Sequence, residues 1–147
     1  MEDSFKNTSP YSKDAEEGLV GSILQSPAEA MDDISGLISS EAFFIAAYKT
    51  VFETIHEMWD RESPIDPISV AETLEGKGML DAIGGRRTIG ELFTCVASHS
   101  GASHYAKIIA GKYKLRKVLA AAKKCTQDAN DNQHEPDAVV ELSLIHI

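Results

Sequence analysis

Residues 63–80 read SPIDPISVAETLEGKGML, and this segment carries the start and stop signals of one short helix. Asp66 can accept hydrogen bonds from the free backbone amides of the following turn. Pro67 suits the first helical position because its missing amide needs no partner there. Gly76 or Gly78 then ends the helix. The residues spaced to form its apolar face are Ile68, Val70, Ala71 and Leu74.

Helical periodicity continues towards the N-terminus, whereas strand alternation is almost absent from the chain. Residues 15–25 follow Asp14, which we expect to cap a first helix. Residues 27–38 follow Ser26 and Pro27, which repeat the start signal of a capping hydroxyl and a proline. The first of these segments places four apolar residues on one face: Ala15, Leu19, Ile23 and Leu24.

The strongest periodicity lies in residues 46–62, which predict the central helix of the core. Its apolar positions are Tyr48, Val51, Phe52, Ile55, Met58 and Trp59. We expect the side chains of Tyr48, Phe52, Ile55 and Trp59 to be buried. Residues 86–97 predict a further helix through Ile89, Leu92, Phe93 and Val96. This helical periodicity predicts an all-α fold class. Because every connection is short, we expect a compact multi-helix globular head, followed by an antiparallel helical hairpin.

The predicted hairpin begins with one unusually long helix. Residues 104–130 contain no proline and only one glycine, and their length greatly exceeds the average helix of about 11 to 12 residues. Residues 130–136 break this helix, and residues 137–142 begin a second arm that the end of the chain cuts short. A narrow apolar stripe along the long helix is the expected oligomer interface: Ile108, Leu115, Leu119 and Ala122.

The predicted organisation has four parts. They are a disordered tail over residues 1–13, the helical head over 14–100, the hairpin over 101–142 and a non-native tail over 143–147. The formal net charge of −9 excludes a generally basic, DNA-coating protein. Residues 101–127 nevertheless carry seven basic residues and no acid, and part of them forms a basic flank of the long helix at Lys112, Arg116 and Lys123.

Nothing in the sequence predicts a catalytic, cofactor or metal site. Cys95, His99 and His104 supply only three candidate zinc ligands, without a C-x2-C pair, so we interpret them as a core thiol and two loop imidazoles. The adjacent carboxylates Glu16 and Glu17, like Asp32 and Asp33, lack a partner base. We interpret these four as solvated charges at helix starts.

Two cysteines thirty residues apart, Cys95 and Cys125, are typical of reduced intracellular thiols when no secretory leader is visible. The first fourteen residues are polar, and no run approaches the ~20 apolar residues of a membrane span. We therefore expect a cytoplasmic protein with no membrane association.

The ordered set of these segments resembles the N-terminal domain of DnaB-type replicative DNA helicases. The resemblance covers about residues 14–142 and is carried by AEEGLVGSIL at 15–24, YKTVFETIHEMW at 48–59, PIDPISVAETLEGKGMLDAIGG at 64–85, IGELF at 89–93 and HYAKIIAGKYKLRKVLAAA at 104–122. The resemblance implies a non-catalytic assembly and docking domain in DNA replication. Its implied partners are other subunits of the same helicase, primase and a helicase loader.

The family's motor is a RecA-like ATPase domain that binds ATP and magnesium and drives 5'–3' unwinding. No segment of this chain fits its phosphate-binding pattern G-x-x-x-x-G-K-[ST]. The chain alone is therefore not expected to be an enzyme or to hold a cofactor. For the basic flank we favour solvation and pairing with acidic helices of a neighbouring subunit over phosphate binding, so DNA contact is expected to be weak or indirect.

Two other hypotheses stay open. The helicase-binding domain at the C-terminus of bacterial primases shares the plan of a globule and a hairpin, but a primase places its catalytic regions before that domain. A stand-alone small protein that mimics the helicase collar is the other alternative. Whether the reading frame continues into a motor domain would separate this alternative from the helicase.

Overall fold

The computed structural model describes residues 9–96, 101–131 and 136–146, and every regular element in these ranges is helical. This confirms the predicted all-α fold class. The chain divides into two compact units. One is Tyr11–Gly111, called the head unit below. The other, called the hairpin unit, contains residues 112–131 and 136–146 together with residues 9 and 10. Most of the predicted N-terminal tail lies outside the described residues.

Helix α1 (Lys13–Gln25) is the buried helix of the head unit, and its predicted apolar face is confirmed. The predicted cap at Asp14 is wrong: Ser12 is the N-cap, and its Oγ accepts from the Ala15 amide at 3.2 Å. The helix begins at Lys13, so Asp14 already lies inside the first turn.

Two glycines let α1 approach its neighbours closely. A Cβ atom on Gly21 would lie 2.5 Å from the carbonyl oxygen of Leu92, and one on Gly18 would lie 2.7 Å from the ring of Tyr105. No real side chain tolerates such distances to backbone or to a packed ring. Small residues in α1 therefore allow contact with α5 (Gly85–Thr94) and with the first turns of α6 (Ala102–Asn130).

Helix α2 (Pro27–Ile34) starts at the predicted proline but ends four residues earlier than expected. The chain turns at Gly36, whose φ of 74° lies in the left-handed region that favours glycine. Ser26 precedes the helix, but its hydroxyl forms no capping hydrogen bond. The short 3-10 helix η1 (Ser40–Ala42) then leads to the next long helix.

Helix α3 (Ala46–Asp60) is the predicted central helix, and Phe52 and Ile55 are buried as expected. The prediction is wrong for Tyr48 and Trp59, which are only half-buried. Both side chains lie at the edges of the apolar face, where neighbouring helices cover them incompletely. The ring of Phe43 packs on that of Phe52, with centroids 4.8 Å apart.

Helix α4 (Pro67–Gly76) confirms the start signal predicted at Asp66 and Pro67. Asp66 Oδ1 accepts from the Ser69 amide at 2.8 Å, and Oδ2 accepts from the Ser69 hydroxyl at 2.8 Å. The hydrogen bond from the Ser69 backbone, followed by that from its hydroxyl, lowers the pKa of Asp66. Ile68 was wrongly placed on the apolar face: it is 71% exposed, because it lies roughly 110° round the helix from the centre of the buried face. That buried face is Val70, Ala71 and Leu74.

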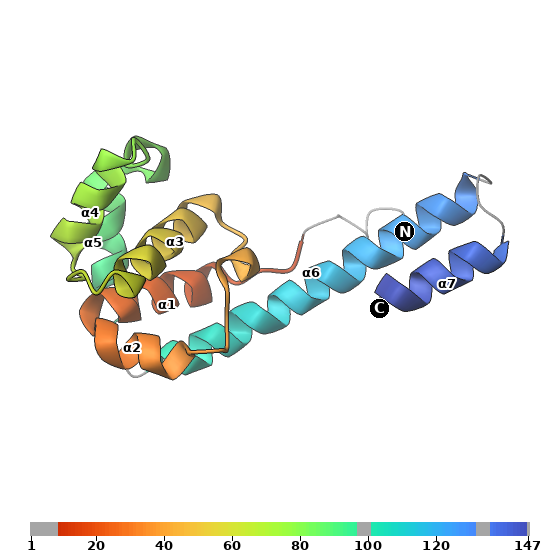
Figure 1. Ribbon diagram of the computed structural model, residues 1–147, viewed down its shortest axis with the longest axis horizontal. Helices are drawn as coiled ribbons and strands as arrows, with labels where there is room; N and C mark the ends of the chain where they lie inside the picture. Colours follow the sequence, from red (N-terminus) through yellow and green to blue (C-terminus); the bar gives the residue numbers. More distant parts are fainter. Residues whose placement is uncertain (1–8, 97–100, 132–135, 147) are drawn as a thin grey trace, which may run out of the picture. The chain divides into compact units, whose positions relative to one another are not determined.

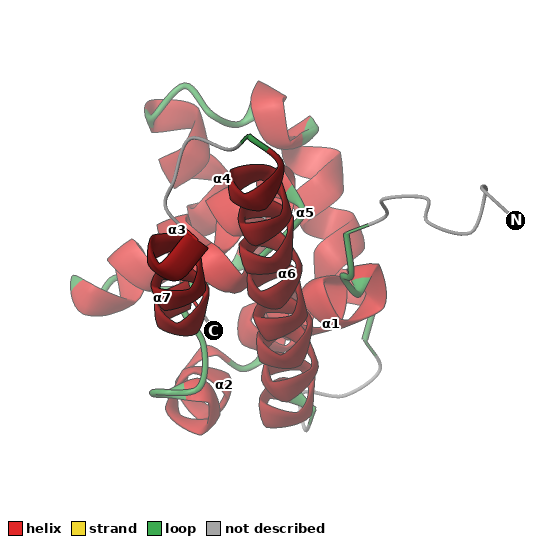
Figure 2. Ribbon diagram, turned by 90° about the vertical axis from the view of Figure 1, so that its right-hand side faces the viewer, coloured by secondary structure: helices red, strands yellow, loops and turns green. Residues whose placement is uncertain are grey.

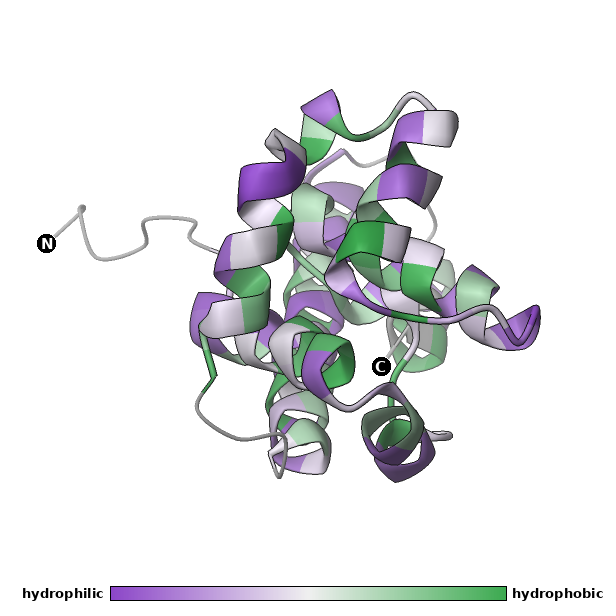
Figure 3. Cartoon of the chain, turned by 90° about the vertical axis from the view of Figure 1, so that its left-hand side faces the viewer, coloured by the Kyte–Doolittle hydropathy of each residue, from purple (hydrophilic) through white to green (hydrophobic). Residues whose placement is uncertain are grey.

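The helix η2 (Asp81–Ile83) and Gly84, with φ 104°, lead into α5. Ile89 and Leu92 of α5 are buried, whereas Phe93 is exposed and Val96 lies just beyond the helix. Figure 3 shows hydrophobic and hydrophilic residues alternating along the helices of the head unit, as expected of amphipathic helices.

Helix α6 (Ala102–Asn130) has 29 residues and confirms the predicted long helix. Its first turns belong to the head unit, where Ala102, Ala106 and Ile109 are buried. Within the hairpin unit, α7 (Pro136–His146) runs back beside the C-terminal part of α6 (Figures 1 and 2). Residues 143–146, for which the sequence predicts a non-native tail, continue α7.

Candidate assembly and docking surfaces

The predicted interface stripe lies along the outer face of α6. Leu115 and Leu119 are 52% and 54% exposed, and Ala122 is also exposed. Ile108 belongs to the head unit and is half-buried, so it differs from the other three. Val118, absent from the predicted set, is as exposed as its two leucine neighbours. We call Leu115, Val118, Leu119 and Ala122 the α6 stripe.

Exposed large hydrophobic side chains are more frequent per residue in the hairpin unit than in the longer head unit, whose described residues expose an equal number. Three more belong to α7, so the described residues of this unit expose six large hydrophobic side chains: Leu115, Val118, Leu119, Val140, Leu144 and Ile145. A two-helix unit has few neighbours to cover such residues. Large apolar patches on the surface of soluble proteins commonly mark interaction sites, so the hairpin unit is the candidate assembly surface.

The basic flank lies beside this stripe, and its three members have different surroundings. Arg116 Nη1 donates to the Pro10 carbonyl at 2.8 Å, and its guanidinium lies 5.5 Å from the ring centroid of Tyr113. Lys112 is half-buried and Lys123 is exposed. At least one of the three cations is therefore engaged within its own unit, and the flank is not a uniform phosphate-binding row.

The paired carboxylates of α1 are not solvated charges, contrary to the prediction. Glu16 is only 1% exposed, and its Oε1 accepts from the amides of Phe44 at 3.1 Å and Ile45 at 3.0 Å, immediately before α3. Glu17 accepts from the Tyr48 hydroxyl at 2.6 Å. Burial, followed by this hydrogen bond to Glu17, raises the pKa of Tyr48 above its ordinary value. Both carboxylates hold α1 against α3.

The other residues interpreted from the sequence have plain structural settings. Asp32 and Asp33 are exposed, as expected. Cys95 is an exposed free thiol rather than a core one, and partial burial of its sulfur, followed by the charge of Glu17, raises its pKa. His104 lies in the first turn of α6 rather than in a loop, and His99 lies outside the described residues.

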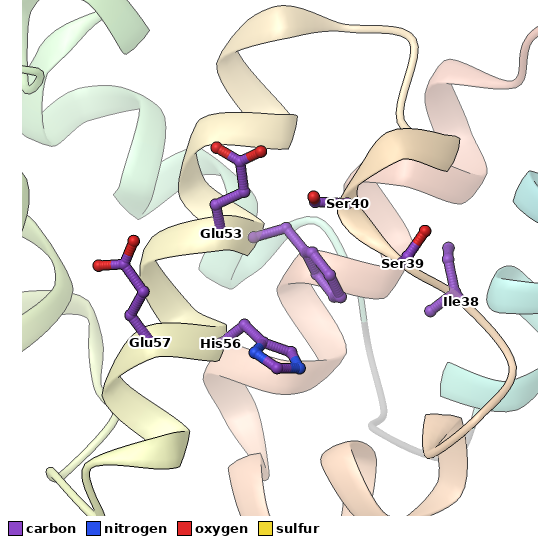
Figure 4. A pocket seen from close by; sticks show the side chains of 7 residues that line it. Ile38, Ser39, Ser40, Glu53, His56 and Glu57 are labelled. Carbon is purple, nitrogen blue, oxygen red and sulfur yellow. The ribbon is translucent and has the colours of Figure 1, made fainter.

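A groove that the sequence did not predict runs along α3 in the head unit. One hollow, of about 340 Å³, lies between residues 38–40 and α3 (Figure 4). A second hollow, of about 240 Å³, shares Ile38, Phe52 and His56 with the first and extends to Trp59. We call the two together the α3 groove. The periodicity of α3 indicates that Phe52 faces inwards, but no local signal shows that the segment after α2 leaves a hollow above it.

The described residues thus define an all-helical domain with exposed apolar side chains in the hairpin unit and a groove in the head unit. The sequence model described as the DnaB-like helicase N terminal domain matches residues 8–111, and the chain belongs to this family. This confirms the resemblance inferred from the sequence, and it favours the helicase hypothesis over the primase one.

Individual relatives agree with this assignment. The chain is 29% identical over 132 residues to the replicative DNA helicase DnaB of Geobacillus stearothermophilus, and 32% identical over 122 residues to that of Buchnera aphidicola subsp. Baizongia pistaciae. These matches cover 90% and 83% of this chain but only 29% and 26% of the relatives. The chain therefore corresponds to less than a third of their length.

The structure is also similar to the crystal structure of the N-terminal domain of DnaB helicase from Mycobacterium tuberculosis. The TM-score is 0.88 at 26% identity, and the match covers 95% of this chain and 98% of the other. No described helix is long and apolar enough to cross a membrane.

Proposed function

We propose that this chain is the non-catalytic assembly and docking domain of a replicative DNA helicase. Copies of the domain associate through the α6 stripe, and primase and a helicase loader dock on the assembled domains. The observation that carries the proposal is the concentration of exposed apolar side chains in the hairpin unit. The family assignment supports it, because the relatives are replicative DNA helicases.

The physical reason for association is that an apolar face in water is unfavourable, at roughly 25 cal/mol per Å². A second copy of the α6 stripe, packed antiparallel, would cover Leu115, Val118 and Leu119 with like residues. Asp137 and Glu141 of α7 would then supply acidic partners for the basic flank of the other copy. Such rim charges set register more than affinity.

In this proposal, ATP hydrolysis and 5'–3' unwinding belong to a motor domain in the remaining length of the helicase, and ATP and magnesium bind there. DNA contact by this domain is indirect. The head unit carries sixteen acidic and seven basic residues, a formal net charge of −9 that repels a phosphate backbone. A stand-alone protein that mimics the helicase collar would associate through the same stripe, so a measurement of self-association tests the α6 stripe for both alternatives.

The test is sedimentation equilibrium of the full chain and of the double variant Leu115→Asp with Leu119→Asp. We expect the wild type to dimerise at tens of micromolar. The variant is expected to be monomeric and folded, because the head unit keeps its own core. Each copy would bring two carboxylates into the interface, and the loss of association should be at least a hundredfold.

A matched control is Ala120→Asp with Gln127→Asp, which adds the same charge at exposed positions on the opposite face of α6. This control should associate like the wild type. A monomeric wild type, or a stripe variant that still dimerises, would remove the α6 stripe from this role.

A further inference from the structure

The α3 groove lies in the head unit and takes no part in association through the α6 stripe. Figure 4 shows Ile38 and Ser39 on one side of the larger hollow and Glu53, His56 and Glu57 of α3 on the other. From Phe52 to Asp60 the groove follows α3 for roughly 12 Å, at a rise of about 1.5 Å per residue. This is long enough for about two turns of a helix laid beside α3.

Apolar side chains form part of the floor of both hollows, although the lining of the second hollow is mostly polar. Phe52 is buried beneath both hollows, and Ile38 is half-buried in the wall that they share. The second hollow adds Met31, Ile34 and half-buried Trp59. Two hollows of a few hundred Å³ on one helix suit a bound helix that presents its apolar side chains on a single face.

The rim of the groove is acidic. Glu53, Glu57 and Asp60 are spaced at i, i+4 and i+7 along α3. Lys77 Nζ donates to Glu57, and His56 Nδ1 lies 3.3 Å from Asp60 Oδ2. Glu53 forms no side-chain hydrogen bond or ion pair within the described part of the chain, although it is half-buried. A cation from outside would complete its interactions.

We propose that the α3 groove binds a positively charged amphipathic segment of a partner protein. The apolar side chains of the segment pack on Ile38 and Trp59, and a lysine or arginine pairs with Glu53. A positively charged segment is favoured because both the rim of the groove and the head unit as a whole are acidic. The proposal rests on the docking role proposed above and gives that role a place and a chemistry.

Trp59 makes the proposal directly measurable, because it is the chain's single tryptophan and it lines the second hollow. The full chain is titrated with a synthetic helical peptide of leucine and lysine, with leucine at i, i+4 and i+7 and no aromatic residue. We expect a saturable change in tryptophan emission with a dissociation constant in the micromolar range. A scrambled peptide of equal composition should bind at least tenfold more weakly, and a leucine–glutamate peptide should not bind.

Two variants locate the binding site. Glu53→Gln keeps the size of the side chain but removes its charge, and should weaken binding three- to tenfold. Ile38→Asp places a charge in the apolar wall and should weaken it more. The control Asp81→Asn removes one exposed charge from η2, outside both hollows, and should bind like the wild type. Thermal melting followed by circular dichroism confirms that each variant is folded.

Equal binding of the scrambled peptide, or equal affinity of wild type, Glu53→Gln and Ile38→Asp, would overturn the proposal. So would loss of self-association in Glu53→Gln, which would assign the groove to a second copy of the chain. Failure of stripe-mediated association appears separately, as a monomeric wild type in sedimentation, and leaves the peptide titration unaffected.

Discussion

The head unit and the hairpin unit are built from the same kind of amphipathic helix, yet they bury their leucines to different extents. In the head unit, Leu19 and Leu74 are fully buried, because several helices surround each one. In the hairpin unit, Leu115 and Leu119 remain more than half exposed. Apolar periodicity therefore shows which face of a helix is suited to burial. The number of neighbouring elements decides whether that face is buried within the same chain or needs a second chain to cover it.

The largest expected effect tests this contrast directly. Phe52→Ala should lower the free energy of unfolding by about 3 to 5 kcal/mol, because it leaves a cavity in the packed head unit. Leu119→Ala, at an exposed position, should change it by less than about 0.5 kcal/mol. Urea denaturation followed by circular dichroism, at low micromolar protein, measures both. Equal losses in the two variants would show that the hairpin unit has a closed core of its own.

A smaller effect tests the polar contacts that hold the head unit together. Glu16→Ala should cost about 1 to 3 kcal/mol, because the Phe44 and Ile45 amides lose their buried acceptor. Glu16→Gln keeps an acceptor oxygen and should cost less. The same urea denaturation measures the free energy of unfolding of both variants. A Glu16→Ala variant as stable as the wild type would mean that water replaces the carboxylate as acceptor.

The smallest effect is one of pH. The folded state holds the pKa of Asp66 below its ordinary value, so its carboxylate stabilises the head unit at neutral pH. That contribution is lost as the pH falls below the ordinary value of ~3.9 and through the lowered one. Asp66→Asn, which keeps a capping side chain, should therefore show a smaller fall in unfolding free energy between pH 7 and pH 3.

Ser69→Ala provides an intermediate for that comparison, since it removes the hydroxyl bond to Asp66 but keeps the backbone one. Its loss of stability on acidification should lie between those of the wild type and Asp66→Asn. If the unfolding free energy of Asp66→Asn falls as much on acidification as that of the wild type, other carboxylates are responsible for the acid sensitivity.

Features that depend on neighbours in sequence were predictable. Asp66 and Pro67 start α4 as their spacing indicates, and the proline-free run after residue 101 became one long helix. Three members of the α6 stripe, Leu115, Leu119 and Ala122, could be identified in the same way, because their spacing is a property of a single helix. The role of the stripe at an interface remains a prediction.

Features that depend on distant residues were not predictable in this way. Glu16 looks like a solvated charge beside Glu17, and only the chain before α3 makes it a buried acceptor. Trp59 follows the apolar period of α3 but finds too few neighbours to cover it. The α3 groove depends on how the segment after α2 crosses α3, which no periodicity encodes.

The buried carboxylate of Glu16 also has a consequence for the order in which the head unit folds. The caps of α1 and α4 join residues three positions apart, so each helix can satisfy them as soon as its first turn forms. The amides before α3 bond to a side chain 28 and 29 positions away, and Ile45 caps α3 without a side-chain bond. The N-terminal end of α3 is therefore completed only when α1 docks, and an isolated α3 peptide would fray there.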